Sequence, residues 1–498
     1  MILLPATVLI PLAAAFCVTV LDLINKEFNE ELALEIISGT SILVTLIISL
    51  VLFGNYGIYN MAGWEFPLGI ILVLDGLTGP VLVITNFVAL MCIIFSYNYI
   101  KKYGSREKYY ALFLLMLTGM NGVIITGDIF NLYIFLELAS IASYALVGYG
   151  TQREEIEATF KYLVLSSIGT AFMLLGIGLV YANTANLNMA YIAEILAAGG
   201  QTPVSIYLAA ILFIVGFSIK SAIVPFHAWL PDAHSSAPAP ISAMLSGVLI
   251  KTIGIYAFIR VTYVMLGMNS GPVPQILRIF GTMSMVAGVL LALGQWDFKR
   301  LLAYHSISQM GYIALGFGLA TPLGIIGGLF HLLNHSVFKS LLFLNSGAVD
   351  YRLKTRNLKK MGGLNQKMPV TGATSMIASL SISGIPPFNG FWSKLVIIIA
   401  AFQAGHPVLA GWAVIASILT LGSFIKLQRY AFIGNIKKSL KKIKEVTYSM
   451  QIPMIILALA CIFMGIIFIP AIREEVLAPA AELLLDPSGY IKLVRGGL

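Results

Sequence analysis

Residues 205–229 read SIYLAAILFIVGFSIKSAIVPFHAW, an apolar stretch that contains a lysine, Lys220, and a proline, Pro225, five residues later. A membrane-spanning helix needs roughly 20 mostly apolar residues, so this stretch is long enough to cross a bilayer. Proline removes a backbone hydrogen bond and opens a helix. A charged side chain at membrane depth costs roughly 2.5–3.5 kcal/mol on insertion. The stretch therefore predicts a broken transmembrane helix with a functional lysine close to the break.

The composition extends this prediction to the whole chain. Of its 498 residues, 58% are hydrophobic and 11% are charged, against about 25% charged in a typical soluble domain. At roughly 20 residues a span, the apolar residues suffice for about 14 spans. A soluble enzyme, a disordered chain and a disulfide scaffold are excluded. The net charge of +9 lies in short loops and predicts membrane topology, not nucleic-acid binding.

We therefore predict an all-α polytopic membrane protein with about 14 transmembrane helices. The expected spans are 2–22, 32–53, 70–98, 109–127, 129–149, 157–183, 205–229, 238–263, 273–295, 300–320, 323–348, 368–403, 408–432 and 450–471. The twelfth is too long for one straight helix and contains Gly384-Ile385-Pro386-Pro387, so it is predicted to be broken like the seventh.

The basic residues are distributed unevenly between the loops. About 22 of the 31 lie in loops after odd-numbered spans, mainly at 101–108, 352–367 and 426–444. The loops after even-numbered spans hold only Arg260 and Arg278. Because cytoplasmic loops are enriched in lysine and arginine, the odd loops are assigned to the cytoplasm of a cell-membrane protein. Both termini are then outside, which requires an even number of spans.

Three short sequence matches recur in the same order along the chain. SYALVGYG (143–150) matches GYIALGFG (311–318), Phe160-Lys161-x-Leu163 matches Phe338-Lys339-x-Leu341, and Ile223-x-Pro225-Phe226 matches Ile385-x-Pro387-Phe388. They pair spans five, six and seven with ten, eleven and twelve. An offset of five spans inverts the second copy in the membrane, as in many secondary transporters. We predict N-terminal spans in 1–107, inverted five-helix repeats in 108–266 (spans 4–8) and 267–434 (spans 9–13), and a basic loop, last span and tail in 435–498.

One acid and several bases fall inside apolar segments, where ionisable groups are usually functional. Glu137 is the only charge in its span, NLYIFLELASIASYAL. Glu137 and Lys220 could form a pair that exchanges a proton, because a carboxylate favours the charged lysine and burial disfavours it. A structural ion pair is the alternative for Glu137. For Lys220 the alternative is a side chain that reaches back to the membrane surface.

Further candidates lie in spans eight, eleven and twelve. Lys251 sits midway along span eight, and Lys394 follows the second break. His331, His335 and Lys339 are spaced by four residues and share one helix face. Histidine can pass protons near neutral pH, so this stripe is a candidate relay. A metal or haem site and hydrogen-bonded core histidines are the alternatives.

Weaker candidates are His227 and His234, which lie in a proline-rich connector after the first break, and Asp128 and Lys161, which lie near membrane faces. A structural or interfacial role is an equal alternative for each of them. The three cysteines, at positions 17, 92 and 461, form no CxxC or Cys/His cluster. We therefore expect no metal site and no cofactor in this chain.

Four runs resemble the antiporter-like subunits of the complex I superfamily. They are GDIFNLYIFLELASIASYALVGYG, KSAIVPFHAWLPDAHSSAPAPISAMLSGVLIK, HSISQMGYIALGFG and HLLNHSVFKSLLFLNSGAV. The resemblance extends from about residue 70 to 430. Within the superfamily the chain most resembles the D subunit of Mrp-type sodium/proton antiporters and the related subunit of archaeal membrane-bound hydrogenases. Its GDIFNLYIFLE run and the lysine after the second break indicate this group.

The resemblance implies roles for named residues. Glu137 and Lys220 match the family's glutamate–lysine pair, and Lys251 matches its bridging basic residue. The histidines at 331 and 335 match the central relay, and Lys394 matches the terminal site. It also implies work within a multi-subunit complex, with other antiporter-like subunits and with either sodium or a peripheral redox module.

The sequence thus predicts a proton- or cation-translocating membrane subunit. A stand-alone transporter of an organic solute is the first alternative, but it would need a pocket of varied polar side chains. A catalytic redox subunit is the second, and the lack of cofactor ligands disfavours it. Whether the chain serves an antiporter or an ion-translocating oxidoreductase stays open at this point, as do the stoichiometry and the direction of transport.

Overall fold

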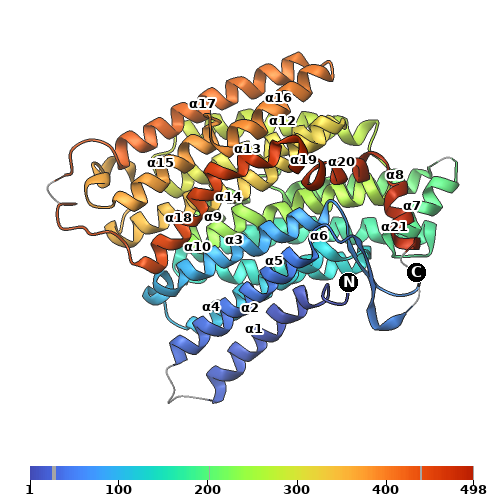
Figure 1. Cartoon of the computed structure of the whole chain (residues 1–498), viewed down its shortest axis with the longest axis horizontal. Helices are drawn as coiled ribbons and strands as arrows, with labels where there is room; N and C mark the ends of the chain where they lie inside the picture. Colours follow the sequence, from blue (N-terminus) through green and yellow to red (C-terminus); the bar gives the residue numbers. More distant parts are fainter. Residues whose placement is uncertain (25–29, 65, 201, 438–439, 497–498) are drawn as a thin grey trace.

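A computed structural model of the chain describes residues 1–24, 30–64, 66–200, 202–437 and 440–496. Residues 25–29, in the loop between the first two predicted spans, and residues 438–439 of the basic loop lie outside the described residues. Long helices run side by side along one direction and form an elongated bundle (Figure 1). The prediction of an all-α polytopic membrane protein is confirmed, apart from one short β-hairpin.

Within the described residues, ten helices are long and apolar enough to cross a membrane. They are α2 (Glu30–Leu52), α3 (Thr78–Tyr99), α4 (Arg106–Ile125), α5 (Ile129–Val147), α6 (Arg153–Thr184), the continuous stretch from α10 to η4 (Ala239–Met265), α12 (Pro272–Leu293), α14 (Pro322–Leu353), α17 (Pro407–Ala431) and α18 with η8 (Tyr448–Phe468). The remaining predicted spans coincide with α1 (Ala6–Ile24), α8 (Val204–Lys220), α13 (Phe298–Gly318), and the pair α15 (Pro369–Ser383) and α16 (Asn389–Gln403). Fourteen crossings stay a prediction.

Both predicted breaks are present. Helix α8 ends at Lys220, and the chain resumes helical structure in α9 (Trp229–Ser236). The indole of Trp229 donates to the carbonyl of Ile219 at 2.9 Å, and the hydroxyl of Ser284 accepts from the N–H of Val224 at 2.8 Å. These bonds satisfy backbone groups that the break frees, as membrane burial requires. In the second break, Gly384 ends α15 at φ +75°, a conformation that costs glycine little.

The predicted start of the third span at residue 70 is wrong. Residues Gly57–Asn60 (β1) and Ile71–Leu74 (β2) pair as an antiparallel hairpin, and α3 begins only at Thr78. The reason is Asp75, whose Oδ1 accepts from the backbone N–H groups of Leu77 and Thr78 at 3.0 and 2.9 Å. An aspartate that satisfies the first free N–H groups fixes the start of a helix at this point.

The eighth span is mostly not α-helical. Between α10 (Ala239–Met244) and α11 (Ala257–Ile259) lies the π-helical stretch η3 (Leu245–Tyr256), and a second π-helical stretch, η4 (Arg260–Met265), follows. Such stretches are rare in proteins and are found frequently at functional sites. This π-helical segment contains Lys251 and is fully buried.

Arg260 does not lie in a loop, as the topology count assumed, but inside η4. Its guanidinium binds both carboxylate oxygens of Asp75, at 2.6 and 3.0 Å, and both side chains are 3% exposed. The guanidinium also lies 5.3 Å from the ring centroid of Tyr490, in the C-terminal helix α21 (Ser488–Gly496). Pairing with Asp75 is what allows a charged side chain at this depth. Arg260 therefore no longer counts among the basic residues of the loops after even-numbered spans. The excess of basic residues in the loops after odd-numbered spans is accordingly larger.

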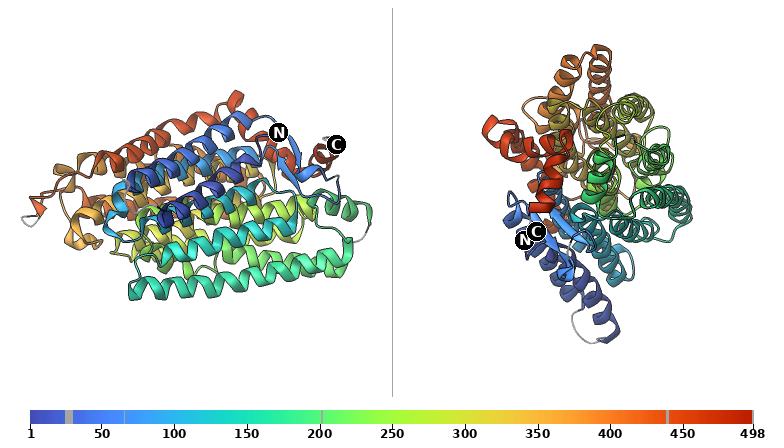
Figure 2. Two further views of the ribbon diagram at one scale, coloured as in Figure 1. Left: turned by 90° about the horizontal axis from the view of Figure 1, so that it is seen from below. Right: turned by 90° about the vertical axis from the view of Figure 1, so that its right-hand side faces the viewer.

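The two termini lie at the same end of the bundle (Figures 1 and 2). Helix α7 (Met189–Ala198) lies at this end, where Glu194 binds Arg495 of α21 at 2.6 Å. The loops that hold most basic residues lie at the other end, where Lys102 approaches Asp350 at 3.8 Å and Lys437 donates to the carbonyl of Lys359. The short helices α19 (Pro470–Val476) and α20 (Ala478–Leu485) precede α21.

The same loop contact occurs at both ends of the bundle. Before α5, the backbone N–H groups of Ile129 and Met189 donate to Leu187 and Gly127, each at 2.9 Å. Before α13, those of Phe298 and Leu358 donate to Arg356 and Trp296, also at 2.9 Å. Each residue of the second contact lies the same number of residues after its counterpart in the first contact. This number, the constant interval, is the sequence separation between Ile129 and Phe298. An inverted repeat of five spans would produce this recurrence, and the full pairing of the halves stays a prediction.

This constant interval corrects one sequence match. Helices α6 and α14 are both 32 residues long, and their first residues, Arg153 and Pro322, are separated by the same interval. It pairs Lys161 with Phe330, so Lys161 and Lys339 are not equivalent positions. Their environments differ accordingly, because Lys161 is exposed in the first third of α6 whereas Lys339 is fully buried within α14. The four-letter similarity that suggested the match is too short to fix a register over helices of this length.

Candidate functional site

Glu137 and Lys220 come together, as the sequence predicted, from the middle of α5 and the last residue of α8. The Nζ of Lys220 lies 3.9 Å from Oε1 of Glu137, and Lys220 is 1% exposed while Glu137 is 24% exposed. The ammonium group donates to the hydroxyls of Ser166 and Ser140 at 2.6 and 2.9 Å. Oε1 of Glu137 has no hydrogen-bond partner among the described residues. The pair is therefore a loose one, held by charge more than by hydrogen bonds.

Lys251 is buried in η3, and among the described residues its amine bonds only to its own helix. Its Nζ donates to the carbonyls of Ser246 and Gly247 at 2.5 and 2.6 Å. A π-helix leaves these carbonyls accessible, because its backbone bonding pattern differs from that of an α-helix. No carboxylate accompanies Lys251 in the described residues' ion pairs, so its charge is compensated by carbonyl dipoles alone.

A polar connection runs from Lys339 to Lys251 through hydrogen bonds and, within Ser246, through the covalent bonds between its hydroxyl and its carbonyl. The Nζ of Lys339 donates to the carbonyl of Leu302 at 2.5 Å, and the same carbonyl accepts from Ser306 at 3.1 Å. The hydroxyl of Ser306 lies 2.7 Å from that of Ser246, whose carbonyl binds Lys251. All residues of this connection are buried. Two lysines of different helices thus share one polar connection.

The two histidines of α14 stack on each other and are fully buried. Their ring centroids are 6.2 Å apart with an interplanar angle of 9°. Nδ1 of His331 lies 2.9 Å from the hydroxyl of Ser393, and Nε2 lies 3.1 Å from Oε1 of Gln309. Both ring nitrogens of His335 lack a partner among the described residues. A buried imidazole without partners needs water or a proton acceptor beside it.

Lys394 lies in α16, just after the second break, and its amine reaches back to the break. Its Nζ donates to the carbonyl of Ile382 at 2.7 Å, which the end of α15 leaves free, and lies 4.7 Å from the ring centroid of Tyr312. The ring of Tyr312 is in turn 5.5 Å from that of His331. Lys394 is therefore connected to the histidines on one side. On its other side it lines a cavity of about 230 Å³ between α16 and α17.

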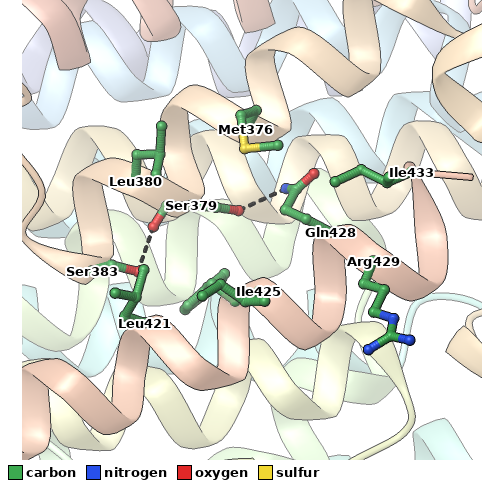
Figure 3. Close-up of a pocket in the computed structure, with 10 residues that line it drawn as sticks. Met376, Ser379, Leu380, Ser383, Leu421, Ile425, Gln428, Arg429 and Ile433 are labelled. Carbon is green, nitrogen blue, oxygen red and sulfur yellow. Dashed lines mark hydrogen bonds between the residues drawn. The ribbon is translucent and has the colours of Figure 1, made fainter.

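A second cavity of about 400 Å³ adjoins the first and shares Ser383 and Leu421 with it. It lies between α15 and α17, and its walls are apolar except for Arg429 and one row of uncharged polar side chains (Figure 3). In this row Gln428 donates to Ser379 at 2.8 Å, and Ser383 donates to the carbonyl of Ser379 at 2.6 Å (Figure 3). The two cavities extend from Lys394 toward Ile433, at the end of the bundle with the basic loops.

The weaker candidates separate into buried and surface groups. His234 is fully buried, and neither of its ring nitrogens has a partner among the described residues. Nδ1 of His227 lacks a partner there as well. Asp128 caps α5 by accepting from the N–H of Asn131 at 2.7 Å. Lys161 pairs with Glu157 and Asp232 at 2.7 and 3.1 Å near the bundle end, as an interfacial residue would.

Sequence reasoning missed two buried bases and two polar connectors. Lys299 directly precedes the predicted tenth span (300–320) and was therefore counted with the loops, but it is 3% exposed in the first turn of α13. His305, also in α13, is fully buried and lies 2.8 Å from the hydroxyl of Ser423. Gln309 and Tyr312 connect the histidines to their surroundings. The signal was present in the run KRLLAYHSISQMGY, which has a polar residue on every helix face and so cannot face lipid.

The candidate site as a whole consists of one carboxylate and five buried bases, of which Lys394 also lines a cavity. It includes Glu137, Lys220, Lys251, His335, His331 and Lys394, from five different helices. Among the described residues, no three histidine, cysteine, aspartate or glutamate side chains gather closely enough to hold a metal ion. Groups that gain and lose protons, spaced through the membrane interior, are suited to moving protons.

Comparison with known proteins gives a consistent picture. Residues 126–420 match the family described as NADH:quinone oxidoreductase/Mrp antiporter, transmembrane. The D subunit of the Na(+)/H(+) antiporter of Alkalihalophilus pseudofirmus is 33% identical over 467 residues, which cover 92% of this chain and 94% of the relative. The N subunit of the NADH-quinone oxidoreductase of Desulforudis audaxviator is 35% identical over 425 residues, with 82% and 84% covered.

Two solved structures share the fold over almost the whole length. A chain of the Mrp complex from a Dietzia species superposes with a TM-score of 0.89 at 27% sequence identity, and 99% of each chain is covered. A chain of the membrane-bound sulfane sulfur reductase, an archaeal respiratory membrane complex, superposes with a TM-score of 0.89 at 30% identity, again with 99% of each chain covered. Both structures are complexes of several subunits.

Proposed function

Since this chain belongs to the NADH:quinone oxidoreductase/Mrp antiporter transmembrane family, and is thereby an ion-translocating subunit of a multi-subunit membrane complex, we propose that it moves protons through its buried bases. The path consists of the Glu137–Lys220 pair, Lys251, the two histidines of α14 and Lys394. Lys394 is the terminal site, from which the adjoining cavities lead to the end of the bundle with the basic loops.

The observation that carries this proposal is the environment of Lys220. A buried lysine whose nearest carboxylate is 3.9 Å away keeps a favourable charge interaction without a rigid hydrogen bond. Glu137 can therefore move away, and the lysine then loses the charge that stabilises its protonated form. Displacement of the carboxylate would release the proton toward Lys251. The two serine hydroxyls at 2.6 and 2.9 Å keep the amine in place during this step.

The path uses side chains of this chain only, and we propose that no cofactor or metal takes part within it. The driving force would come from the other subunits of the complex. Among the relatives, the D subunit is named for Na(+)/H(+) antiport, whereas the archaeal complex is a sulfane sulfur reductase. Proton flux in the purified native complex distinguishes these couplings, because it requires either a sodium gradient or an electron donor and acceptor.

We also propose an orientation for the chain in the cell membrane. The termini, α7 and the β-hairpin would face outward, and the end with the basic loops would face the cytoplasm. The support is the excess of lysine and arginine in the loops at one end, which the burial of Arg260 in η4 increases. Protons would then pass between an outer and a cytoplasmic opening.

The experiment replaces Lys220 by arginine, histidine or alanine and measures proton or sodium flux in vesicles that contain the whole complex. Arginine keeps the positive charge but is effectively always protonated, so Lys220→Arg should abolish turnover. Histidine can exchange protons, so Lys220→His should retain partial flux. Lys220→Ala should abolish flux. Lys360→Arg makes the same chemical change in an exposed loop and serves as the matched control.

Assembly of each variant is checked on a native gel. Near-normal flux in Lys220→Arg would show that the lysine acts as a fixed charge and that the proton path runs elsewhere. Loss of flux in both the arginine and histidine variants, with normal assembly, would point to steric disruption and would contradict proton exchange at this position.

A further inference from the structure

We propose that Trp229, which lies beyond the first break, is a positioning residue for Lys220. The indole acts through the carbonyl of Ile219 and through the rings of Tyr162 and Tyr144, and it holds the lysine amine at the place where the amine exchanges its proton. This inference rests on the proposed function, because it explains how the structure fixes a group that the proposed path uses.

The first route from the indole to the amine runs through the backbone at the end of α8. Lys220 is the last residue of this helix, so no further helical turn holds its backbone on the side of the break. The buried indole of Trp229 donates to the carbonyl of Ile219 at 2.9 Å. An indole N–H can only donate, and a buried one needs its acceptor. The bond therefore fixes the peptide group from which the side chain of Lys220 starts.

The second route runs through three buried aromatic rings. The ring of Trp229 is stacked on that of Tyr162 in α6, with centroids 4.2 Å apart and an interplanar angle of 7°. Tyr162 in turn meets the ring of Tyr144 in α5 edge-on, at 4.6 Å and 89°. Nζ of Lys220 lies 3.4 Å from the hydroxyl of Tyr144. Close-packed groups transmit a displacement instead of absorbing it, so a shift of the indole would reach the hydroxyl beside the amine.

Contacts on both sides of Lys220 set the distance between α6 and α8. Gly169 of α6 and Gly216 of α8 touch through their backbones, since a methyl group on Gly216 would lie 2.7 Å from the carbonyl oxygen of Gly169. One turn away on α6, Ser166 accepts from Nζ of Lys220 at 2.6 Å. A further turn along the same face, Tyr162 stacks on the indole. Because the glycine contact does not involve the indole, loss of the indole should displace the end of α8 without separating the two helices.

The amine depends on this support because its partner carboxylate does not hold it rigidly. Nζ of Lys220 donates to uncharged hydroxyl groups, and Oε1 of Glu137 lies 3.9 Å away without a hydrogen bond. The energy between two charges varies inversely with their separation. A shift of the amine would therefore change its interaction with Glu137, and it would also change the geometry of proton transfer, which tolerates little misplacement.

The test measures proton or sodium flux in vesicles that contain the whole complex, with assembly checked on a native gel. Trp229→Phe keeps an aromatic ring beside Tyr162 but removes the N–H that binds Ile219. We expect this variant to assemble normally and to lower the flux by about 10-fold to 10²-fold, since a displacement of about 1 Å can cost 10²-fold. Trp412→Phe makes the same replacement at an exposed tryptophan of α17 and should leave the flux unchanged.

A double variant separates positioning from packing. Tyr144→Phe keeps the ring but removes the hydroxyl beside the amine, so it should also lower the flux. If Trp229 and Tyr144 hold the same amine, their effects are coupled, and the double variant should lose less flux than the product of the two single losses. Single losses that multiply would show independent packing effects and would overturn the positioning role, as would wild-type flux in Trp229→Phe.

Two further variants keep the outcome decisive. If Trp229→Phe does not assemble, Tyr162→Leu takes its place, because it removes the ring between the indole and Tyr144 and keeps the bond to Ile219; wild-type flux in Tyr162→Leu would then overturn the positioning role. Lys220→Arg separates this inference from the proposed function. If Lys220→Arg is inactive while Trp229→Phe has wild-type flux, only the positioning role fails. If Lys220→Arg is active, the proposed function fails and the positioning role fails with it.

Discussion

The ion pair between Asp75 and Arg260 gives a sharp prediction about stability. Asp75→Asn removes one negative charge but keeps a side-chain oxygen that can accept from the N–H groups of Leu77 and Thr78. The start of α3 is therefore preserved. Arg260 keeps its contact with the hydroxyl of Thr78 at 2.8 Å but loses its only carboxylate among the described residues. The variant thus isolates the effect of an uncompensated buried charge.

The size of the effect follows from the geometry. Both side chains are 3% exposed, and the two bonds at 2.6 and 3.0 Å are bidentate. Breaking a buried pair by removing one partner typically costs about 3–5 kcal/mol, because the remaining charge stays desolvated. We expect Asp75→Asn to lie in this range. Asp75→Asn combined with Arg260→Gln removes both charges and should recover at least half of the loss.

The measurement is thermal unfolding of the purified complex in detergent, followed for this subunit. Asp486→Asn is the matched control, since Asp486 is an exposed aspartate at the same end that accepts from the N–H of Ser488. An exposed change of this kind should stay within about 0.5 kcal/mol of the parent. If Asp75→Asn is no less stable than Asp486→Asn, or if the double variant is no more stable than the single one, the pair does not stabilise the fold as argued.

Three further predictions concern topology and transport. In a background without the exposed Cys17, cysteines at Gly104 and Lys442 should be labelled from the cytoplasm and one at Ala198 from outside, and the opposite pattern would reverse the orientation. Glu137→Gln removes the charge that holds the proton on Lys220 and should reduce flux by about 10²-fold or more with normal assembly; unchanged flux would leave Glu137 a structural residue. Lys394→Arg should block flux as Lys220→Arg does, while Lys394→His should keep part of it; near-normal flux with arginine would remove Lys394 from the path.

Much of the fold could be predicted because membrane burial constrains sequence strongly. Apolar stretches of about 20 residues, prolines inside two of them and basic loops on one side are each set by the solvent that surrounds the chain. The same constraint identified Glu137, Lys220, Lys251 and Lys394, since a charge in an apolar stretch stands out. The structure brings Glu137 and Lys220 together at 3.9 Å, although they lie on helices that are far apart in the sequence.

The features that could not be predicted depend on tertiary partners. Arg260 looked like a loop residue because Asp75, far earlier in the chain, is invisible as its partner in the sequence. The π-helical bonding of η3 has no local signature either. Lys299 was missed because it lies beside Arg300 and close to Asp297, where a lysine usually faces water. Only the fold shows that α13 buries one of these two neighbouring basic residues and exposes the other.

The loop contact that recurs at both ends of the bundle has an evolutionary consequence. In the first copy, residues 126–131 and 184–189 contain no lysine or arginine, whereas in the second copy residues 295–300 and 353–358 contain Lys299, Arg300, Lys354 and Arg356. The backbone hydrogen bonds and the aspartate caps are nonetheless the same. The basic residues of these loops direct how the chain is inserted into the membrane. The backbone hydrogen bonds hold the two loops of each contact together. If the predicted inverted repeat arose by duplication, these two properties could have diverged separately, and one folding unit would be present in opposite orientations within a single chain.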